Sequence, residues 1–329
     1  FNFKYYNFKK VYIYFCILAL LNIFFSTEKI KANTFSINHI EISSPFEINF
    51  DKNEIIDKGF NIAFDELVLS IIQTKDQKKL KNISLVIIKG MIETFSIQEE
   101  KFINDIYYLS LNVSFNKKKI FKLLESRNIF PSLPIKKKVF LIPIVLDETK
   151  NEILMFSESY LFKNWNSDLK KHHLLEYVLP TEDLEDFNLI KSNSKNLENY
   201  DFKEIINKYN IENFIITIIF KNNNEIRVLN KINFNEKIYL KNLRFQNLKL
   251  NDNKEIMKFI EHLKNTFENH WKSKNEINTS VKSFFTISVK NNDNKKIYNL
   301  EKVLTNIDLI YDFYIYKFDN KNNFYKIIF

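Results

Sequence analysis

VFLIPIVL occupies residues 139–146, and FIITIIF occupies residues 214–220. Each is a continuous apolar run of strand length, which is typical of a strand buried on both faces of a sheet. Pro143 lacks a backbone N–H, so the first strand should be bulged or at an edge there. Residues 228–234 and 237–246 read as further strands, and residues 255–271 carry apolar side chains along one helical face. The sequence predicts a central unit in which this helix packs on a sheet.

The chain before this unit predicts a second sheet with helices. Residues 61–72 place Ile62, Leu67 and Ile71 near helical spacing after a charged approach. Residues 107–115 alternate between apolar and polar side chains, as a half-buried strand does, and Asn116 then caps a short helix. The periodicity of residues 83–97 fits a strand and a helix equally well, so their state stays open.

Downstream segments predict smaller elements. We expect helices around residues 169–177, after the acidic start at residues 180–186, and over residues 201–209. The last part of the chain predicts a strand, a helix and two strands, at residues 281–289, 300–306, 309–317 and from 324 onward. This β-α-β-β order resembles the first four elements of a ferredoxin-like module.

Pro131 and Pro134 mark the clearest boundary, because residues before proline are pushed to extended conformations. We therefore expect an α+β protein of two or three small mixed domains after a signal peptide, the last of them partly ferredoxin-like. The expected divisions are residues 1–32 for the signal peptide, 33–130 for an N-terminal α+β domain, 136–275 for a central α/β domain with a mixed sheet, and 279–329 for a C-terminal β-α-β-β domain.

The first residues carry the features of an export signal. Lys9 and Lys10 precede an apolar run at residues 11–25, and a short polar stretch follows and ends at Ala32. The run is shorter than the ~20 residues of a spanning helix. We expect cleavage near Ala32 and a periplasmic or secreted protein, with an uncleaved anchor as the alternative.

Composition limits the chemistry of the exported protein. The 329 residues include only Gly59 and Gly90 as glycines, and abundant Lys, Asn, Ile and Phe indicate an AT-rich genome. The formal net charge is +9, and the lysines of the leader carry part of it. Cys16 lies inside the leader, so a mature chain would hold no thiol for a disulfide, a nucleophile or a metal.

Asp168 and His172 are the weak candidates for a catalytic pair. They lie four residues apart on a predicted helix, where a carboxylate can orient an imidazole. His173 should point about 100° away from His172 on such a helix, which disfavours one shared metal. His262 and His270 are too far apart for one ion, and we expect both at the surface.

The remaining clusters are more typical of structure than of chemistry. One cluster is typical of a helix start and consists of Glu182, Asp183, Glu185 and Asp186. Glu99 and Glu100 are more typical of a solvated turn. The Asn-rich segments 291–294 and 319–323 lack the glycine and the closing glutamate of a calcium loop. No Gly-rich phosphate loop or Gly-x-Ser-x-Gly elbow is present. We expect no cofactor and no metal site.

Several segments match a known family in their order. They are the alanine-led helix AFDELV at residues 63–68, the strand at residues 107–115 leading to KIFKLL at residues 119–124, the apolar run at residues 139–146, Trp165 with Leu169, and YVLP at residues 177–180. To about residue 190 the chain resembles a secreted bacterial family known only as the domain of unknown function 2066. A glycine expected after the first helix is replaced by Lys75 and Asp76. The resemblance implies a cell-envelope setting and supplies no site residues.

These observations lead us to expect a non-catalytic envelope protein that acts through contact with another protein or in envelope assembly. A metal-dependent envelope hydrolase is the first alternative. The second is a peripheral membrane-surface binder that uses the lysine runs at residues 117–119 and 136–138. We expect a protein partner and no specific nucleic acid, with membrane contact only through the leader or surface lysines.

Overall fold

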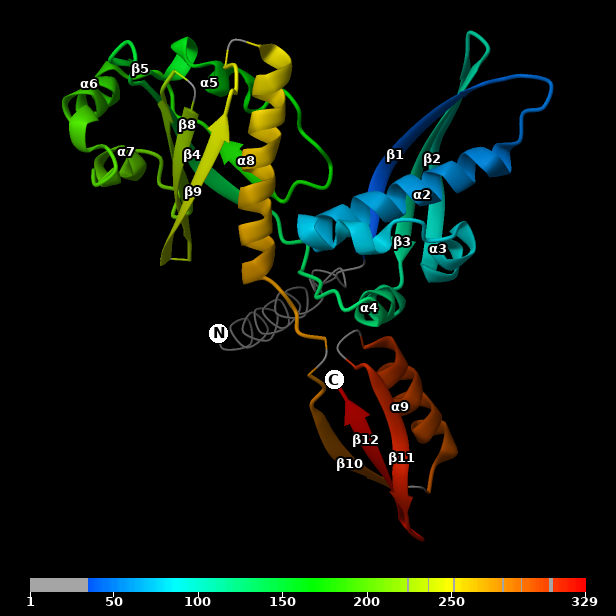
Figure 1. Cartoon of the computed structure of the whole chain (residues 1–329). Helices are drawn as coiled ribbons and strands as arrows, with labels where there is room; N and C mark the ends of the chain where they lie inside the picture. The colour runs from blue at the N-terminus through cyan, green and yellow to red at the C-terminus, as the bar shows by residue number, and fades with distance from the viewer. Residues whose placement is uncertain are drawn as a thin grey trace, which may run out of the picture.

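The computed structural model describes residues 35–223, 225–235, 237–250, 252–279, 281–290, 292–307 and 310–329, and the expected signal peptide lies outside them. The protein is α+β (Figure 1). Its described strands form two three-stranded sheets and one six-stranded sheet. Each sheet has its own apolar side chains to bury, and helices cover them.

The first sheet contains β1 (Phe35–Pro45), β2 (Ile92–Ile103) and β3 (Ile106–Phe115) in the antiparallel order β1-β3-β2. The alternation in β3 is confirmed, because its apolar residues face the core. The helix expected at residues 61–72 is confirmed and begins earlier, as α2 (Lys52–Ile71), because the side chain of Asp51 caps it. A Cβ at Gly59 would lie 2.5 Å from Leu111 Cδ1, so glycine permits the close approach of α2 to β3.

The ambiguous segment contains both structures, because α3 (Leu85–Met91) runs directly into β2. A short 3-10 helix, η1 (Thr74–Leu80), connects α2 to this part of the chain. After β3, α4 (Lys117–Ser126) begins where Asn116 Oδ1 accepts a hydrogen bond from Lys119 N at 3.1 Å. The predicted cap at Asn116 is therefore confirmed.

The central sheet is mixed and contains the two runs that were predicted to be buried strands. Its strands are β4 (Lys137–Asp147), β5 (Glu152–Leu154), β6 (Leu175–Val178), β7 (Phe214–Lys221), β8 (Glu225–Phe234) and β9 (Lys237–Gln246). β4 pairs in parallel with β6 and β7, and the other pairs are antiparallel. On one side, Pro143 pairs with Thr217 of β7. On the other side, β6 pairs with residues 137–140 of β4 and β5 pairs with residues 145–147, so Pro143 lies in the gap between these two strands. The strand is thus locally an edge at Pro143, as a residue without an N–H requires.

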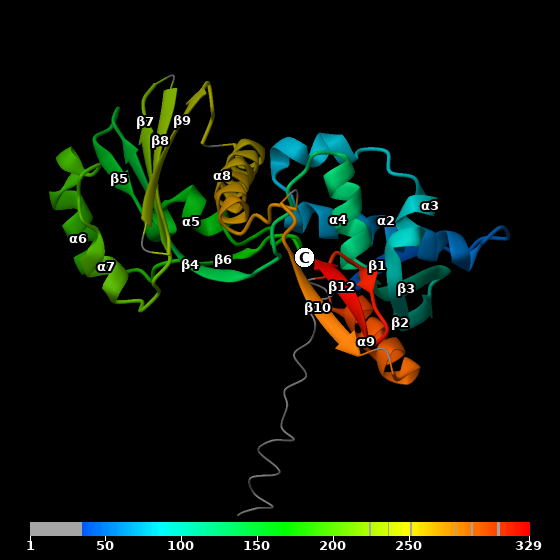
Figure 2. The ribbon, with the colours of Figure 1, turned by 90° about the horizontal axis from the view of Figure 1, so that it is seen from below.

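Helices cover both faces of the central sheet (Figure 2). The long α8 (Asn253–Lys274) and α5 (Tyr160–Asn164) pack on one face, and the predicted apolar side of α8 is buried there. The opposite face is covered by α6 (Leu184–Ser192) and α7 (Lys203–Asn207). Because both faces are covered, β4 and β7 are apolar at nearly every position.

The third unit confirms the predicted β-α-β-β order. It consists of β10 (Phe284–Lys290), α9 (Asn294–Asn306), β11 (Asp312–Phe318) and β12 (Asn322–Ile328). β12 lies between β10 and β11 and is antiparallel to both. The first sheet has the same arrangement, since β3 lies between β1 and β2.

The helix predicted around residues 169–177 is wrong. Residues 168–174 form a loop, and residues 175–178 belong to β6. Leu175 and Tyr177 are buried in the sheet, so their spacing reflects strand alternation. Of the two histidines expected at the surface, His262 is exposed, whereas His270 is half-buried and its ring stacks on Tyr239 with centroids 4.3 Å apart.

The connections between units run side by side. Leu133 N donates to Asn275 O at 3.2 Å, and Ile277 N donates to Pro131 O at 2.7 Å. Ser132 N also donates to Ile71 O at 2.7 Å, at the end of α2. None of the helices within the described ranges combines the length and apolar character needed to cross a bilayer.

Candidate functional site

The two candidate catalytic residues lie in the loop between α5 and β6, where the first and central units meet. His172 Nδ1 lies 3.1 Å from Glu66 Oε2, which α2 supplies from the first unit. The backbone carbonyl of Asp168 accepts a hydrogen bond from Lys264 Nζ at 3.0 Å, while the residue itself is exposed. The structure thus brings His172 to a carboxylate, but this carboxylate belongs to Glu66.

This pair belongs to a group of buried and partly buried titratable side chains that we call the junction cluster: Glu66, His172, His173, Lys264, Glu268 and Lys272. The last three lie on α8 and are almost fully buried. Glu268 Oε1 accepts hydrogen bonds from the backbone N–H of Leu174 at 3.0 Å and of Leu175 at 2.9 Å. Lys272 Nζ donates to the carbonyl of Leu69 in α2. The cluster therefore joins α8 both to the loop and to the first unit.

The environment sets the charge of each group. The hydrogen bond with His172 lowers the pKa of Glu66. Burial lowers the pKa of His173 to about 4, so this imidazole is neutral at pH 7. Burial raises the pKa of Glu268 and lowers the pKa of Lys272, and each of these groups opposes the shift of the other. The pKa shifts therefore favour the charged form of Glu66. They favour the neutral forms of the more deeply buried His173, Glu268 and Lys272.

The arrangement is chemically suited to holding two units together. A carboxylate that orients an imidazole is also part of a hydrolytic triad, but a triad needs a hydroxyl or thiol bonded to that imidazole. Within the described ranges, the hydrogen bond of His172 to a side chain goes to Glu66, and no serine or threonine hydroxyl bonds to His172. Glu66 lies 106 positions from His172 in the sequence, so no local spacing could have identified it.

Replacing Glu66 by Gln should weaken the contact between the units. We expect Glu66→Gln to lower the free energy of unfolding at pH 7 by about 1 kcal/mol, because it removes a partly buried charge-assisted hydrogen bond. The folded pKa of Glu66 is lowered, so this contribution is present above its unfolded pKa of about 4.3 and is lost as the pH falls through the folded pKa. Urea unfolding at pH 7 and pH 3 measures both effects.

Asp168→Asn is the matched control, because it removes the carboxylate that sequence spacing suggested. It should change the unfolding free energy at pH 7 by less than about 0.5 kcal/mol, as at other exposed positions. A larger loss for Asp168→Asn than for Glu66→Gln would contradict the observed pairing.

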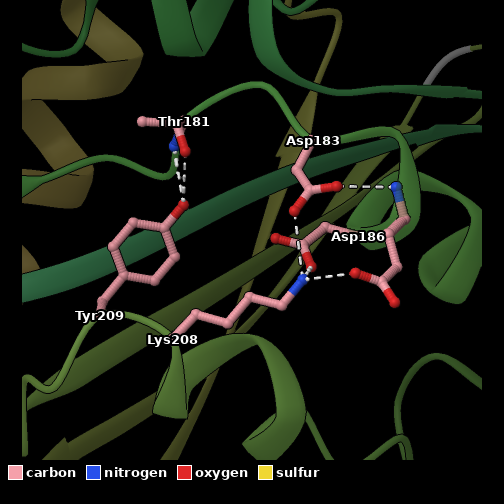
Figure 3. A network of polar contacts seen from close by, with 6 residues as sticks. Thr181, Asp183, Asp186, Lys208 and Tyr209 are labelled. Atoms are coloured by element: carbon pink, nitrogen blue, oxygen red, sulfur yellow. Dashed lines mark hydrogen bonds and ion pairs between the residues drawn. The ribbon is translucent and has the colours of Figure 1, made fainter.

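The acidic segment forms a helix start, as predicted. Asp183 caps α6 by accepting a hydrogen bond from Glu185 N at 2.8 Å. The ammonium of Lys208 lies 3.1 Å from Asp183 Oδ2, 3.2 Å from Glu185 Oε2 and 2.7 Å from Asp186 Oδ1 (Figure 3). The hydrogen bonds that Lys208 donates to these carboxylates, to Asp186 first, raise the pKa of Lys208. A lysine therefore takes the place that a hard cation would occupy.

The other weak candidates also take structural roles, although Glu99 and Glu100 lie in β2 and do not form the expected turn. Glu100 accepts hydrogen bonds from Lys52 Nζ at 2.8 Å and from the Tyr107 hydroxyl at 2.9 Å. Asp293 caps α9, and Asp319 accepts hydrogen bonds from Lys321 N and Asn322 N in the turn between β11 and β12. These contacts account for the carboxylates by capping and ion pairing.

No family model and no curated protein matches this chain.

Proposed function

We propose that the chain is an exported envelope protein that acts by binding another protein, and that the outer face of its third sheet is the contact surface. The proposal combines the leader, the resemblance to the secreted family and one feature of the third unit. It assigns the junction cluster the role of holding the first and central units in position.

The observation that carries the proposal is the exposed apolar face of this sheet. On the inner face, Tyr325 and Ile327 pack against residues of α9, such as Leu304. On the outer face the exposed fractions are 60% for Phe284 and 44% for Tyr314 of β11. Exposed apolar patches on soluble proteins mark interaction sites, and aromatic residues are enriched at the centres of protein interfaces.

Lysines lie among these aromatic side chains. Lys326 Nζ lies 4.0 Å from the centroid of the Phe284 ring, and Lys317 Nζ lies 5.3 Å from that of Phe324. Tyr314 pairs with Lys326 across the sheet and shares this face. A partner with apolar side chains at its centre and carboxylates at its rim would complement this surface.

Three lysines of the runs proposed for membrane contact have partners within this chain. Lys118 Nζ donates to the Thr305 carbonyl at 3.0 Å, and Lys119 Nζ donates to the Gly90 carbonyl at 2.7 Å. Lys138 Nζ lies 3.9 Å from Glu176 Oε1. These contacts favour the protein-binding proposal over the membrane-surface alternative.

Site-specific photocrosslinking in living cells tests the proposal. A photoreactive residue at Tyr314 of the full chain is expected to yield one discrete protein adduct in the envelope fraction. The same residue at Tyr298, which is exposed on α9, is the matched control and should not yield that adduct. Equal adducts at both positions, no adduct at Tyr314, or an unprocessed chain in the cell interior would contradict the proposal.

A further inference from the structure

A groove of about 680 Å³ lies beside α7, on the face of the central sheet that α6 and α7 cover. Its apolar lining consists of Phe202, Ile206, Ile211, Phe214, Ile216 and Ile238. The groove is far from the junction cluster, which lies against α8 on the other face. Its volume falls within the range of about 300–1,000 Å³ that is usual for small-molecule sites.

The groove exists because the sheet extends beyond the helices on this face. Ile238 of β9 pairs with Asn233 of β8, and Leu240 pairs with Lys231, so these four side chains share the face of α7. The helices cover β4 and β7, whereas Ile238 and Leu240 are 61% and 58% exposed. An apolar floor therefore continues from under α7 to open solvent.

Lys231 places a cation on this floor. The residue is half-buried, and its Nζ donates to the Tyr200 carbonyl at 3.2 Å and lies 5.4 Å from the centroid of the Phe202 ring. No carboxylate oxygen in the described part of the chain lies within ion-pair distance of this Nζ. An ammonium has three donors, so the carbonyl leaves two for another acceptor.

Two acidic side chains near Lys231 have other cationic partners, and Glu212 also lines the groove. Lys203 pairs with Asp201 at 3.0 Å, and Glu198 pairs with Arg227 at 2.7 Å. Burial lowers the pKa of Lys231, and Asp201 and Glu198 oppose this shift from a distance. Asn233 adds a buried Oδ1 that has no hydrogen-bond partner among the described residues. The groove thus combines an apolar floor with one cation that lacks a paired anion.

We propose that this groove binds a free single-chain carboxylate amphiphile, with the carboxylate at Lys231 and the chain along Ile216, Phe214 and Ile238. One ammonium complements one carboxylate, whereas recognition of a phosphate usually gathers several cations or a bidentate arginine. A single apolar chain gains free energy from each methylene that it buries against the floor. The proposal is independent of the protein-binding surface on the third unit.

Calorimetric titration of the full chain with dodecanoate tests the proposal. We expect one saturable site, and we expect Lys231→Met to weaken binding about 10- to 100-fold, as loss of a charge-assisted hydrogen bond implies. Lys241→Met is the matched control, because Lys241 pairs with Asn230 and faces the other side of the sheet. It should change the affinity less than twofold, and uncharged dodecanol should bind wild type as weakly as dodecanoate binds Lys231→Met.

Ile238→Glu provides a second test at an exposed position that folding tolerates. A carboxylate placed on the floor should abolish dodecanoate binding without changing the thermal midpoint. Equal affinities of wild type and Lys231→Met, or of dodecanoate and dodecanol, would overturn the proposal.

Two further outcomes would assign the groove to another occupant and also overturn the proposal. One is Lys231-dependent sedimentation with phosphatidylglycerol vesicles in the absence of dodecanoate binding. The other is a dimer of the wild-type chain that Ile238→Glu converts to a monomer.

Discussion

Glu268→Ala is expected to lower the free energy of unfolding by about 3 kcal/mol. Glu268 is 2% exposed, and one of its oxygens accepts hydrogen bonds from the N–H groups of both Leu174 and Leu175. Alanine would leave both buried donors unpaired, and each such donor costs about 1–3 kcal/mol. Urea unfolding followed by circular dichroism at pH 7 measures the loss.

Glu268→Gln separates this acceptor role from the charge. The amide oxygen can occupy the position of Oε1 and accept both hydrogen bonds, so we expect a change within about 1 kcal/mol of wild type. Burial raises the folded pKa of Glu268, so wild type loses stability as the pH rises from the unfolded pKa of about 4.3 through the folded pKa. The glutamine variant lacks this loss, so its free energy of unfolding should rise relative to that of wild type over this pH range. Equal effects of alanine and glutamine would refute the acceptor role.

Trp165→Ala should lower the free energy of unfolding by about 4 kcal/mol, because truncation of a fully buried large aromatic residue leaves a cavity. Trp165 is 0% exposed and follows α5 directly. Its ring contacts Tyr177 at 5.6 Å and Phe267 at 6.2 Å between centroids. It therefore fills the space between β6 and α8, and its loss affects both.

Trp165→Phe is the control for ring packing. Trp165 Nε1 is buried and has no hydrogen-bond partner among the described residues, so phenylalanine removes an unpaired donor while it keeps an aromatic ring. We expect Trp165→Phe to lower the free energy of unfolding by less than half as much as Trp165→Ala. Trp271 remains as a fluorescent probe in both variants, with its Nε1 donating to Ile135 O at 2.8 Å. A cost below about 1 kcal/mol for the alanine variant would contradict the central packing role.

The regular elements could be predicted because burial imposes a period on them. The two runs in β4 and β7 are covered on both faces, and the apolar side of α8 faces the sheet. The sequence does not identify the loop at residues 168–174. Leu175 and Tyr177 follow it in β6, and two apolar positions alone are compatible with a helix as well as with a strand. Short apolar segments carry too little periodicity to separate a strand from a helix.

The candidate sites depended on tertiary contacts that local sequence does not record. Glu66 meets His172 only because α2 docks beside the loop after α5. The groove near Lys231 depends on how far β9 extends past α7, which is set by the register with β8. The sequence around a lysine such as Lys231 does not indicate whether a helix will cover the face of the sheet on which that lysine lies.

The hydrogen bond from Ile277 N to Pro131 O, 2.7 Å long, places the exit from the first unit beside the entrance to the third. Ser132 and Glu276 form a bridge between the same two segments. Under mechanical tension between the outer units, this short pair of segments would bear the load first. The six-stranded sheet, which lies entirely between them in sequence, would be shielded from force until that pair had separated.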